Sequence, residues 1–178
     1  KGESPLDCEY SMLQGIKLIH VAAAHMEEGI LKQLCECQVN VNALNYQGWT
    51  ALHYIAQLET PSAAKITCLV KNYIKIDTQD YKGNTALHIA TQKNKLEICK
   101  LLIEAAAKSG VDAIKFQTAV IDEEVSEKSE LVDYQKKNSE SYKNQLELAK
   151  KIHLPNNVWQ ELKEHAEQLG LIFMSSAF

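Results

Sequence analysis

A short phrase running from glycine to histidine occurs three times in the first half of the chain. It occupies residues 15–20, 48–53 and 83–88, with 33 residues from Gly15 to Gly48 and 35 from Gly48 to Gly83, and it does not return after residue 88. A fixed period of this size is typical of stacked repeats, in which one unit is too small to bury its apolar face alone. The period therefore favours a helical solenoid for the first half and indicates that another structure follows it.

Each phrase carries features that begin a helix. The glycine can adopt the backbone conformation that a turn requires, and Thr50 and Thr85 are placed to cap the helix that follows. Lys17 takes this position in the first unit. Further along, apolar residues recur at helical spacing and predict a second helix. They are Ile30, Leu31, Leu34 and Cys35 in the first unit, and Ile98, Cys99, Leu102 and Ile103 in the third.

His20, His53 and His88 invite a catalytic or metal-binding interpretation. They occupy the same position in each unit, however, which favours a role in the scaffold. We expect their rings to bridge backbone and capping groups of neighbouring units. Cys35 and Cys37 lie two residues apart on a predicted helix and point to different faces, so they predict no zinc site.

The Gly-x-Thr-Ala-Leu-His phrase of the second and third units, with its helix pair and polar turn, resembles the ankyrin repeat. The likeness covers about residues 12–108, with units near 12–45, 46–80 and 81–108. The resemblance implies protein binding through the turn tips and the concave helix face. Because exposed aromatic and amide side chains at tips commonly anchor partners, the tip residues are the candidate contacts. They are Tyr46, Gln47, Trp49, Tyr81, Lys82 and Asn84.

A different pattern follows the repeats. The helix of residues 95–108 stops near Gly110, and strands are predicted at 111–118 and 171–176, with an amphipathic helix at 158–169 between them. A polar stretch and a further helix that ends at Leu154 separate the first strand from this helix. The order helix, strand, loop, helix, strand is typical of a parallel α/β sheet.

Residues 109–118, 134–138, 146–151, 159–170 and 173–178 resemble the sialic acid (N-acetylneuraminate) synthase family. The resemblance implies a segment of a TIM barrel, and condensation of phosphoenolpyruvate with N-acetylmannosamine or a related sugar, assisted by a divalent metal. By the family match, Lys115 would steady an anionic oxygen, Gln117 would bond the sugar and Ser176 would contact phosphate. Tyr134 would lie on a loop over the sugar. Without the resemblance, ordinary polar residues at strand ends are the better interpretation.

The chain also differs from the synthase family, and these differences determine the predicted architecture. Residues 87–93 follow the ankyrin pattern where the synthase family has an acidic residue and an Asn-His pair, and the metal-binding histidines come from later strands. A complete barrel takes roughly 200 residues or more, whereas the likeness covers about 70. We therefore predict α + α/β architecture: ankyrin repeats at 1–108, then an incomplete synthase-like segment at 109–178 that shares helix 95–108. A gene fusion at this helix is one origin, and an error in sequence assembly would leave the same pattern.

The predicted function is a protein-interaction module fused to a non-catalytic fragment of a synthase. The alternative is a fragment of a longer synthase-like enzyme. The start at Lys1 and the end at Phe178 also suggest a piece of a longer polypeptide. A net charge of −4 without a basic stripe disfavours nucleic acid and membrane partners. Five irregularly spaced cysteines indicate a reduced, cytoplasmic protein. We expect no metal or cofactor in this chain, and a divalent metal only in a complete parent enzyme.

Overall fold

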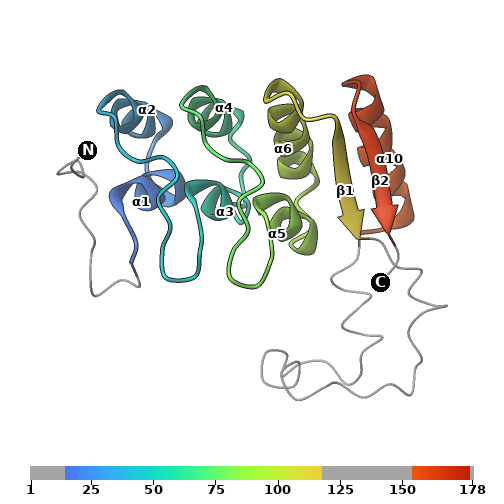
Figure 1. The fold of residues 1–178 in the computed structure, drawn as a ribbon, viewed down its shortest axis with the longest axis horizontal. Coiled ribbons are helices and arrows are strands. Elements are labelled where there is room, and N and C mark those ends of the chain that lie inside the picture. The colour runs from blue at the N-terminus through green and yellow to red at the C-terminus, as the bar shows by residue number, and fades with distance from the viewer. Residues whose placement is uncertain (1–14, 118–153, 177–178) are drawn as a thin grey trace, which may run out of the picture.

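A computed structural model describes residues 15–117 and 154–176 of the 178-residue chain (Figure 1). Its elements are α1 (Leu18–His25), α2 (Glu28–Glu36), α3 (Ala51–Ile55), α4 (Ala63–Lys71), α5 (Ala86–Gln92), α6 (Leu96–Lys108), β1 (Ala113–Gln117), α10 (Asn156–Gln168) and β2 (Ile172–Ser176). None of the helices in these ranges is long and apolar enough to cross a membrane.

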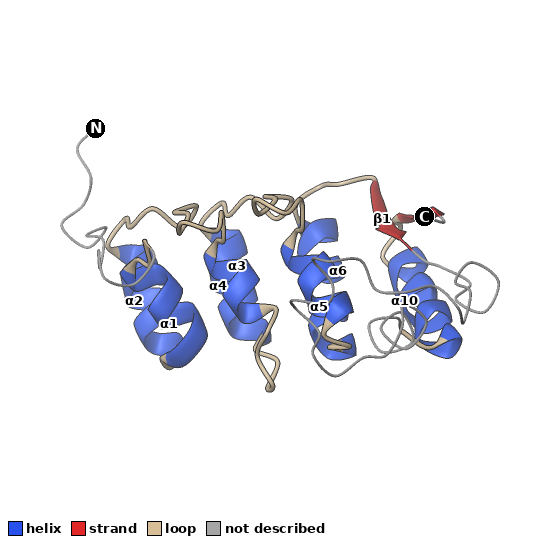
Figure 2. Cartoon of the chain, turned by 90° about the horizontal axis from the view of Figure 1, so that it is seen from below, coloured by secondary structure: helices blue, strands red, loops and turns tan. Residues whose placement is uncertain are grey.

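The first six helices form a stack of three pairs, as Figures 1 and 2 show. The first helices of the pairs pack in one row, with α1 on α3 and α3 on α5, and the second helices pack in another, with α2 on α4 and α4 on α6. The predicted helical solenoid is thereby confirmed. Its core consists of fully buried aliphatic side chains contributed by every pair. The largest are Ile19, Leu31, Leu52, Ile55, Leu69, Ile98, Leu102 and Ile103. Ile30, predicted as part of the apolar pattern, is instead 42% exposed.

The first helix of each pair begins as predicted, with Thr50 and Thr85 as N-caps of α3 and α5, while Lys17 caps α1. The repeated histidine adds to the cap. Its Nδ1 accepts the backbone N–H of the capping residue, over 3.0 Å from Lys17 to His20 and 3.0 Å from Thr50 to His53. The lysine can therefore replace threonine in the first unit, because its backbone N–H is the group that bonds to the ring.

The other ring nitrogen joins neighbouring units. Because Nδ1 accepts a hydrogen bond, Nε2 carries the proton, and it donates to Ala43 O from His20 (2.9 Å) and to Asn84 O from His53 (3.1 Å). Burial lowers the pKa of both histidines, although these carbonyl contacts act in the opposite direction. The predicted scaffold role is confirmed for His20 and His53. His88 makes the capping contact, but its Nε2 has no partner among the described residues.

Strands β1 and β2 pair in parallel, in a register that runs from Ala113 opposite Ile172 to Gln117 opposite Ser176. Helix α10 packs on β2 and on α6. The ring of Phe116 stacks on Phe173 at 5.2 Å and meets Trp159 edge-on at 5.3 Å. Both strands and the amphipathic helix were predicted, but β1 is shorter than the predicted strand at 111–118 and α10 begins two residues before Val158. The predicted polar stretch and the helix before Leu154 lie outside the described residues.

Candidate functional site: a groove between two turns

A groove of about 440 Å³ lies between the last two turns of the stack and the helices behind them. All six tip residues predicted from the sequence line it, so the structure brings them into one surface. Its lining comprises Tyr46, Gln47, Trp49, Gln57 and Asp80 of the second unit, and Tyr81, Lys82, Asn84, Ile89, Gln92 and Lys93 of the third. We call this surface the turn groove.

Equivalent polar residues hold the two turns in shape. Asn45 Oδ1 accepts the backbone N–H groups of Gln47 (2.8 Å) and Trp49 (2.9 Å). Asp80 Oδ1 does the same for Lys82 (2.9 Å) and Asn84 (2.8 Å). Such side-chain acceptors stabilise a turn from within. Both walls of the groove therefore have a fixed backbone.

The two turns also touch each other. The backbone N–H of Tyr81 donates to Gln47 O at 3.0 Å. Gly48 has φ +78°, and a Cβ there would lie 3.0 Å from Tyr81 Cδ1 and 3.1 Å from Tyr81 N. Glycine is required at this position for both its conformation and its lack of a side chain. Gly15 stands in the same relation to the ring of Tyr46, so the spacing of the turns is a repeated feature.

Trp49 and Asp80 form the base of the groove. The indole Nε1 donates to Asp80 Oδ2 at 3.1 Å, and the indole ring meets Tyr54 edge-on. Burial alone would raise the pKa of Asp80, but the hydrogen bonds from Asn84, Lys82 and Trp49 outweigh it and hold the pKa below the usual range. Trp49 was predicted as an exposed anchor; it is half-buried and ties the two turns together.

The rim of the groove offers aromatic rings and positive charge. Tyr46 is 57% exposed and Tyr81 is 75% exposed. Lys82 and Lys93 are also exposed, and neither forms an ion pair within residues 15–117 and 154–176. With the ionised Asp80 carboxylate at its base, the two lysines at the rim leave the groove with a net charge of +1.

Sequence reasoning missed the part of the groove that the helices supply. Gln92 and Lys93 follow Ile89 by three and four residues, which places them on one face of α5 at its end. Gln92 Nε2 donates to Asn84 Oδ1 at 3.3 Å and thereby joins the helix to the turn. The helical spacing would have identified both residues. Gln57 had no such signal, since it follows the short helix α3 in a turn.

The residues matched to the synthase family lie elsewhere. Lys115, Gln117 and Ser176 belong to the last three residue pairs of the two strands, and the Lys115 side chain is exposed. Tyr134 lies outside the described residues. Nowhere in the described ranges do three or more His, Cys, Asp or Glu side chains gather as a metal site would require. The described part of this segment therefore offers no ligand set for the divalent metal that the family resemblance implies.

Two family profiles match the chain. Residues 14–114 match ankyrin repeats in three copies, and residues 102–178 match the NeuB family. The two likenesses predicted from the sequence are therefore confirmed. The matches overlap over residues 102–114, which include the second half of α6.

Individual relatives divide in the same way. N,N'-diacetyllegionaminic acid synthase of Legionella pneumophila is 40% identical over 83 residues, which are 47% of this chain and 23% of the synthase. Rabankyrin-5 of Mus musculus is 30% identical over 82 residues, 44% of this chain and 7% of that protein. Protein phosphatase 1 regulatory subunit 12A of Mus musculus is 36% identical over 74 residues, which are 42% of this chain and 7% of that protein. The chain thus spans less than a quarter of each of these relatives.

Proposed function

Since the chain belongs to the ankyrin repeat family over residues 14–114, we propose that its repeats are a protein-binding module whose turn groove takes an extended acidic segment of a partner protein. Ankyrin stacks serve as extended binding surfaces. The observation that carries the proposal is the meeting of all six predicted tip residues in one groove, with two lysines at its rim that form no ion pair with a described residue.

The charge of the groove supports an acidic partner. Lys82 rises from one turn and Lys93 from the end of α5, so two ammonium groups border the same hollow. The carboxylate of Asp80 keeps its negative charge while it accepts hydrogen bonds from its own turn and from Trp49, so the two lysines leave the groove lining with a net charge of +1. Complementary charge of this kind favours partner choice and speeds association more than it adds to affinity.

The shape and the other side chains support an extended chain. The rings of Tyr46 and Tyr81 provide rigid contact area, and aromatic side chains are favoured at binding surfaces. The amides of Gln57 and Gln92 can bond to the backbone of a peptide in the groove. Ile89 adds a small apolar floor. Together these groups suit a peptide with acidic residues around one apolar or aromatic side chain.

Selection from a phage-displayed library of random 12-residue peptides tests the proposal. We expect the enriched peptides to be rich in Asp and Glu, and their affinity, measured by fluorescence anisotropy, to fall as NaCl is raised. Lys82→Glu and Lys93→Glu should each weaken binding by about tenfold, the equivalent of about 1.4 kcal/mol. Lys75→Glu is the matched control, because Lys75 is exposed and does not line the groove. Enrichment of neutral or basic peptides, or an equal loss with the control, would contradict the proposal.

For residues 109–178 we propose a non-catalytic piece of the NeuB fold, a TIM-barrel segment. The support is that β1 and β2 are parallel, as in such a barrel, while residues 87–93, in place of its first strand, fold as the ankyrin helix α5. The alternative remains a fragment of a longer synthase. A coding sequence that continues with further barrel strands and their histidines would favour that alternative.

We also propose that the module acts in the cytoplasm. Its support is the state of the cysteines: Cys35 and Cys99 are buried, and burial raises the pKa of Cys35 to about 12 and of Cys99 to about 11. Thiols of this kind stay protonated at neutral pH and react slowly.

A further inference from the structure

We propose that the synthase-like segment, through α10 and the β1–β2 pair, is the C-terminal cap of the repeat stack. Helix α10 packs on the far side of α6 from α4, and Figure 2 shows it as the next member of the row of helices. It therefore occupies the place of the second helix of a fourth repeat. Stacks of repeats need terminal units that cover the last apolar face and present a polar one to solvent.

The apolar side of α10 meets this requirement. Leu162 and Ala166, one helical turn apart, are both 0% exposed and belong to the same hydrophobic cluster as Ile103 of α6. On α6, Lys100, Ile103 and Glu104 share one stripe by their helical spacing, and the contacts of Lys100 with Glu161 and of Glu104 with His165 show that this stripe faces α10. Removal of α10 would expose the fully buried Ile103.

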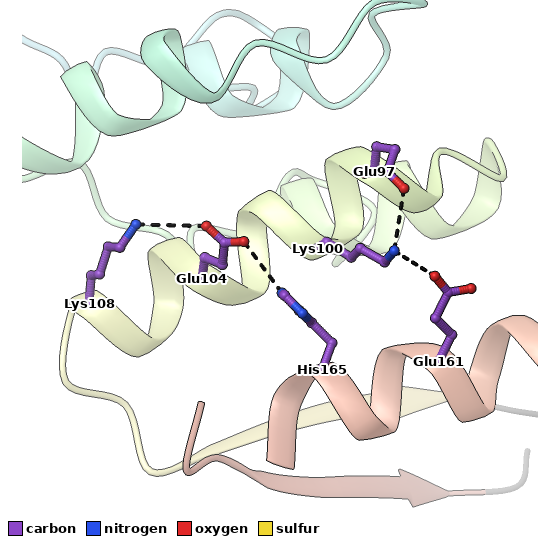
Figure 3. Close-up of polar contacts among 6 residues, drawn as sticks. All are labelled: Glu97, Lys100, Glu104, Lys108, Glu161 and His165. Atoms are coloured by element: carbon purple, nitrogen blue, oxygen red, sulfur yellow. Dashed lines mark hydrogen bonds and ion pairs between the residues drawn. The ribbon is translucent and has the colours of Figure 1, made fainter. Parts of the chain in front are cut away.

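An ion pair and a contact between a carboxylate and an imidazole link α10 to α6, as Figure 3 shows. Lys100 Nζ lies 2.5 Å from Glu161 of α10 and 3.4 Å from Glu97 of its own helix. Glu104 lies 3.6 Å from His165 Nε2 and 3.7 Å from Lys108 Nζ. Within residues 15–117, no ion pair links α2 to α4 or α4 to α6. The last interface thus combines apolar packing with an ion pair, and an ion pair between Lys95 and Glu59 likewise joins the second and third units.

The outer side of α10 is polar, as a cap requires. Lys163, Glu164 and Glu167 are exposed, and Lys163 and Glu167 form a surface ion pair at 3.8 Å. The strand pair supports the helix from the other side, because Trp159 of α10 packs against Phe116 of β1. The segment therefore has an inner apolar face, an outer polar face and its own small support.

The chain offers one tryptophan in each part, Trp49 in the second repeat and Trp159 in the cap. In a Trp159→Phe background, fluorescence reports on the repeats alone. If α10 caps the stack, Leu162→Ala should lower the urea midpoint that Trp49 reports, because the loss of buried contacts is transmitted through α6. Leu169→Ala is the matched control: the same change at the exposed end of the same helix should move the midpoint far less.

A milder pair of variants covers the case in which Leu162→Ala does not fold. Lys100→Met and Glu161→Met, alone and together, form a double-mutant cycle across the interface. We expect the double variant to lose about as much in midpoint as one single variant, rather than the sum of both. An unchanged Trp49 midpoint in the Leu162→Ala chain, or additive losses in the cycle, would overturn the proposal, because the segment would then be independent of the repeats.

Discussion

Tyr73 has a backbone conformation that tyrosine rarely adopts. Its φ is +62°, and Gln38, which follows α2 as Tyr73 follows α4, has φ +58°. The left-handed region costs a residue with a Cβ roughly 1–2 kcal/mol, whereas glycine occupies it freely. The tyrosine ring is 87% exposed, so little packing compensates for this cost. Both helices end at a position where glycine is the favoured residue.

Replacement of Tyr73 by glycine should therefore stabilise the chain. We expect Tyr73→Gly to raise the free energy of unfolding by about 1 kcal/mol, since the relief of strain exceeds the added entropy of the unfolded chain. Urea unfolding measures the effect. Tyr73→Ala is the control, because alanine removes the ring but keeps the Cβ. A gain as large with alanine would show that the ring, rather than the backbone, is the unfavourable feature.

At the scale of the element, the histidine at the third position of α1 and α3 joins a helix start to the next turn. Burial lowers the pKa of His20 and His53, so the folded chain binds their protons less readily than the unfolded chain does. Stability must then be lost as the pH falls below the unfolded pKa of about 6.5, and each unit of lowering corresponds to about 1.4 kcal/mol.

We therefore expect a lower urea midpoint at pH 5.5 than at pH 7.5. Asp80, whose pKa is also lowered, loses its contribution only in more acidic solution, because a carboxylate of ordinary pKa stays ionised at pH 5.5. His53→Gln should reduce the difference between the two pH values, because it removes one of the rings whose pKa burial lowers. Equal stability at both pH values would be inconsistent with the buried neutral rings.

The elements that could be predicted from the sequence are those with local causes. The period, the capping threonines and the placement of the histidines follow from spacing and backbone chemistry, and the structure agrees. Lys65 shows where such reasoning fails. Its Nζ is buried and donates a hydrogen bond to Ala23 O at 3.0 Å, 42 positions back along the chain. The residues next to Lys65 in the sequence do not predict this contact. The docking of α10 on α6 is equally non-local.

The turn groove could be predicted only in part, because some of its features have local causes and others depend on distant residues. The positions of the tip residues can be read from the repeat phrase, because Tyr46 and Tyr81 each lie two residues before its glycine. Whether a tip side chain is available is settled by partners in other units. Asp80, 31 residues further along the chain, accepts a hydrogen bond from the indole of Trp49, so Trp49 is not a freely exposed anchor.

At the scale of the whole molecule, the chain combines two families. Residues 102–178 match an enzyme family, but ankyrin repeats account for most of the described residues. We expect no condensation when the full chain is incubated with phosphoenolpyruvate, N-acetylmannosamine and Mn²⁺. The reason is that the segment where the family resemblance would place the first barrel strand forms helix α5, and that no three His, Cys, Asp or Glu side chains gather among the described residues.

Phosphate release measures this, with a complete member of the NeuB family as the positive control. Release that requires the chain and disappears in Lys115→Met would establish the enzyme alternative. Release that persists in that variant would indicate a contaminating activity rather than one of this strand pair.

Helix α6 is one uninterrupted helix of 13 residues that serves both halves. Each residue of an α-helix advances the chain by a rotation of about 100° and a rise of about 1.5 Å. A single residue inserted near its middle would therefore turn Glu104 and the cap by more than a quarter of a circle about the helix axis. The relative orientation of the two halves is therefore an angular phase that is set by the number of residues in this one helix.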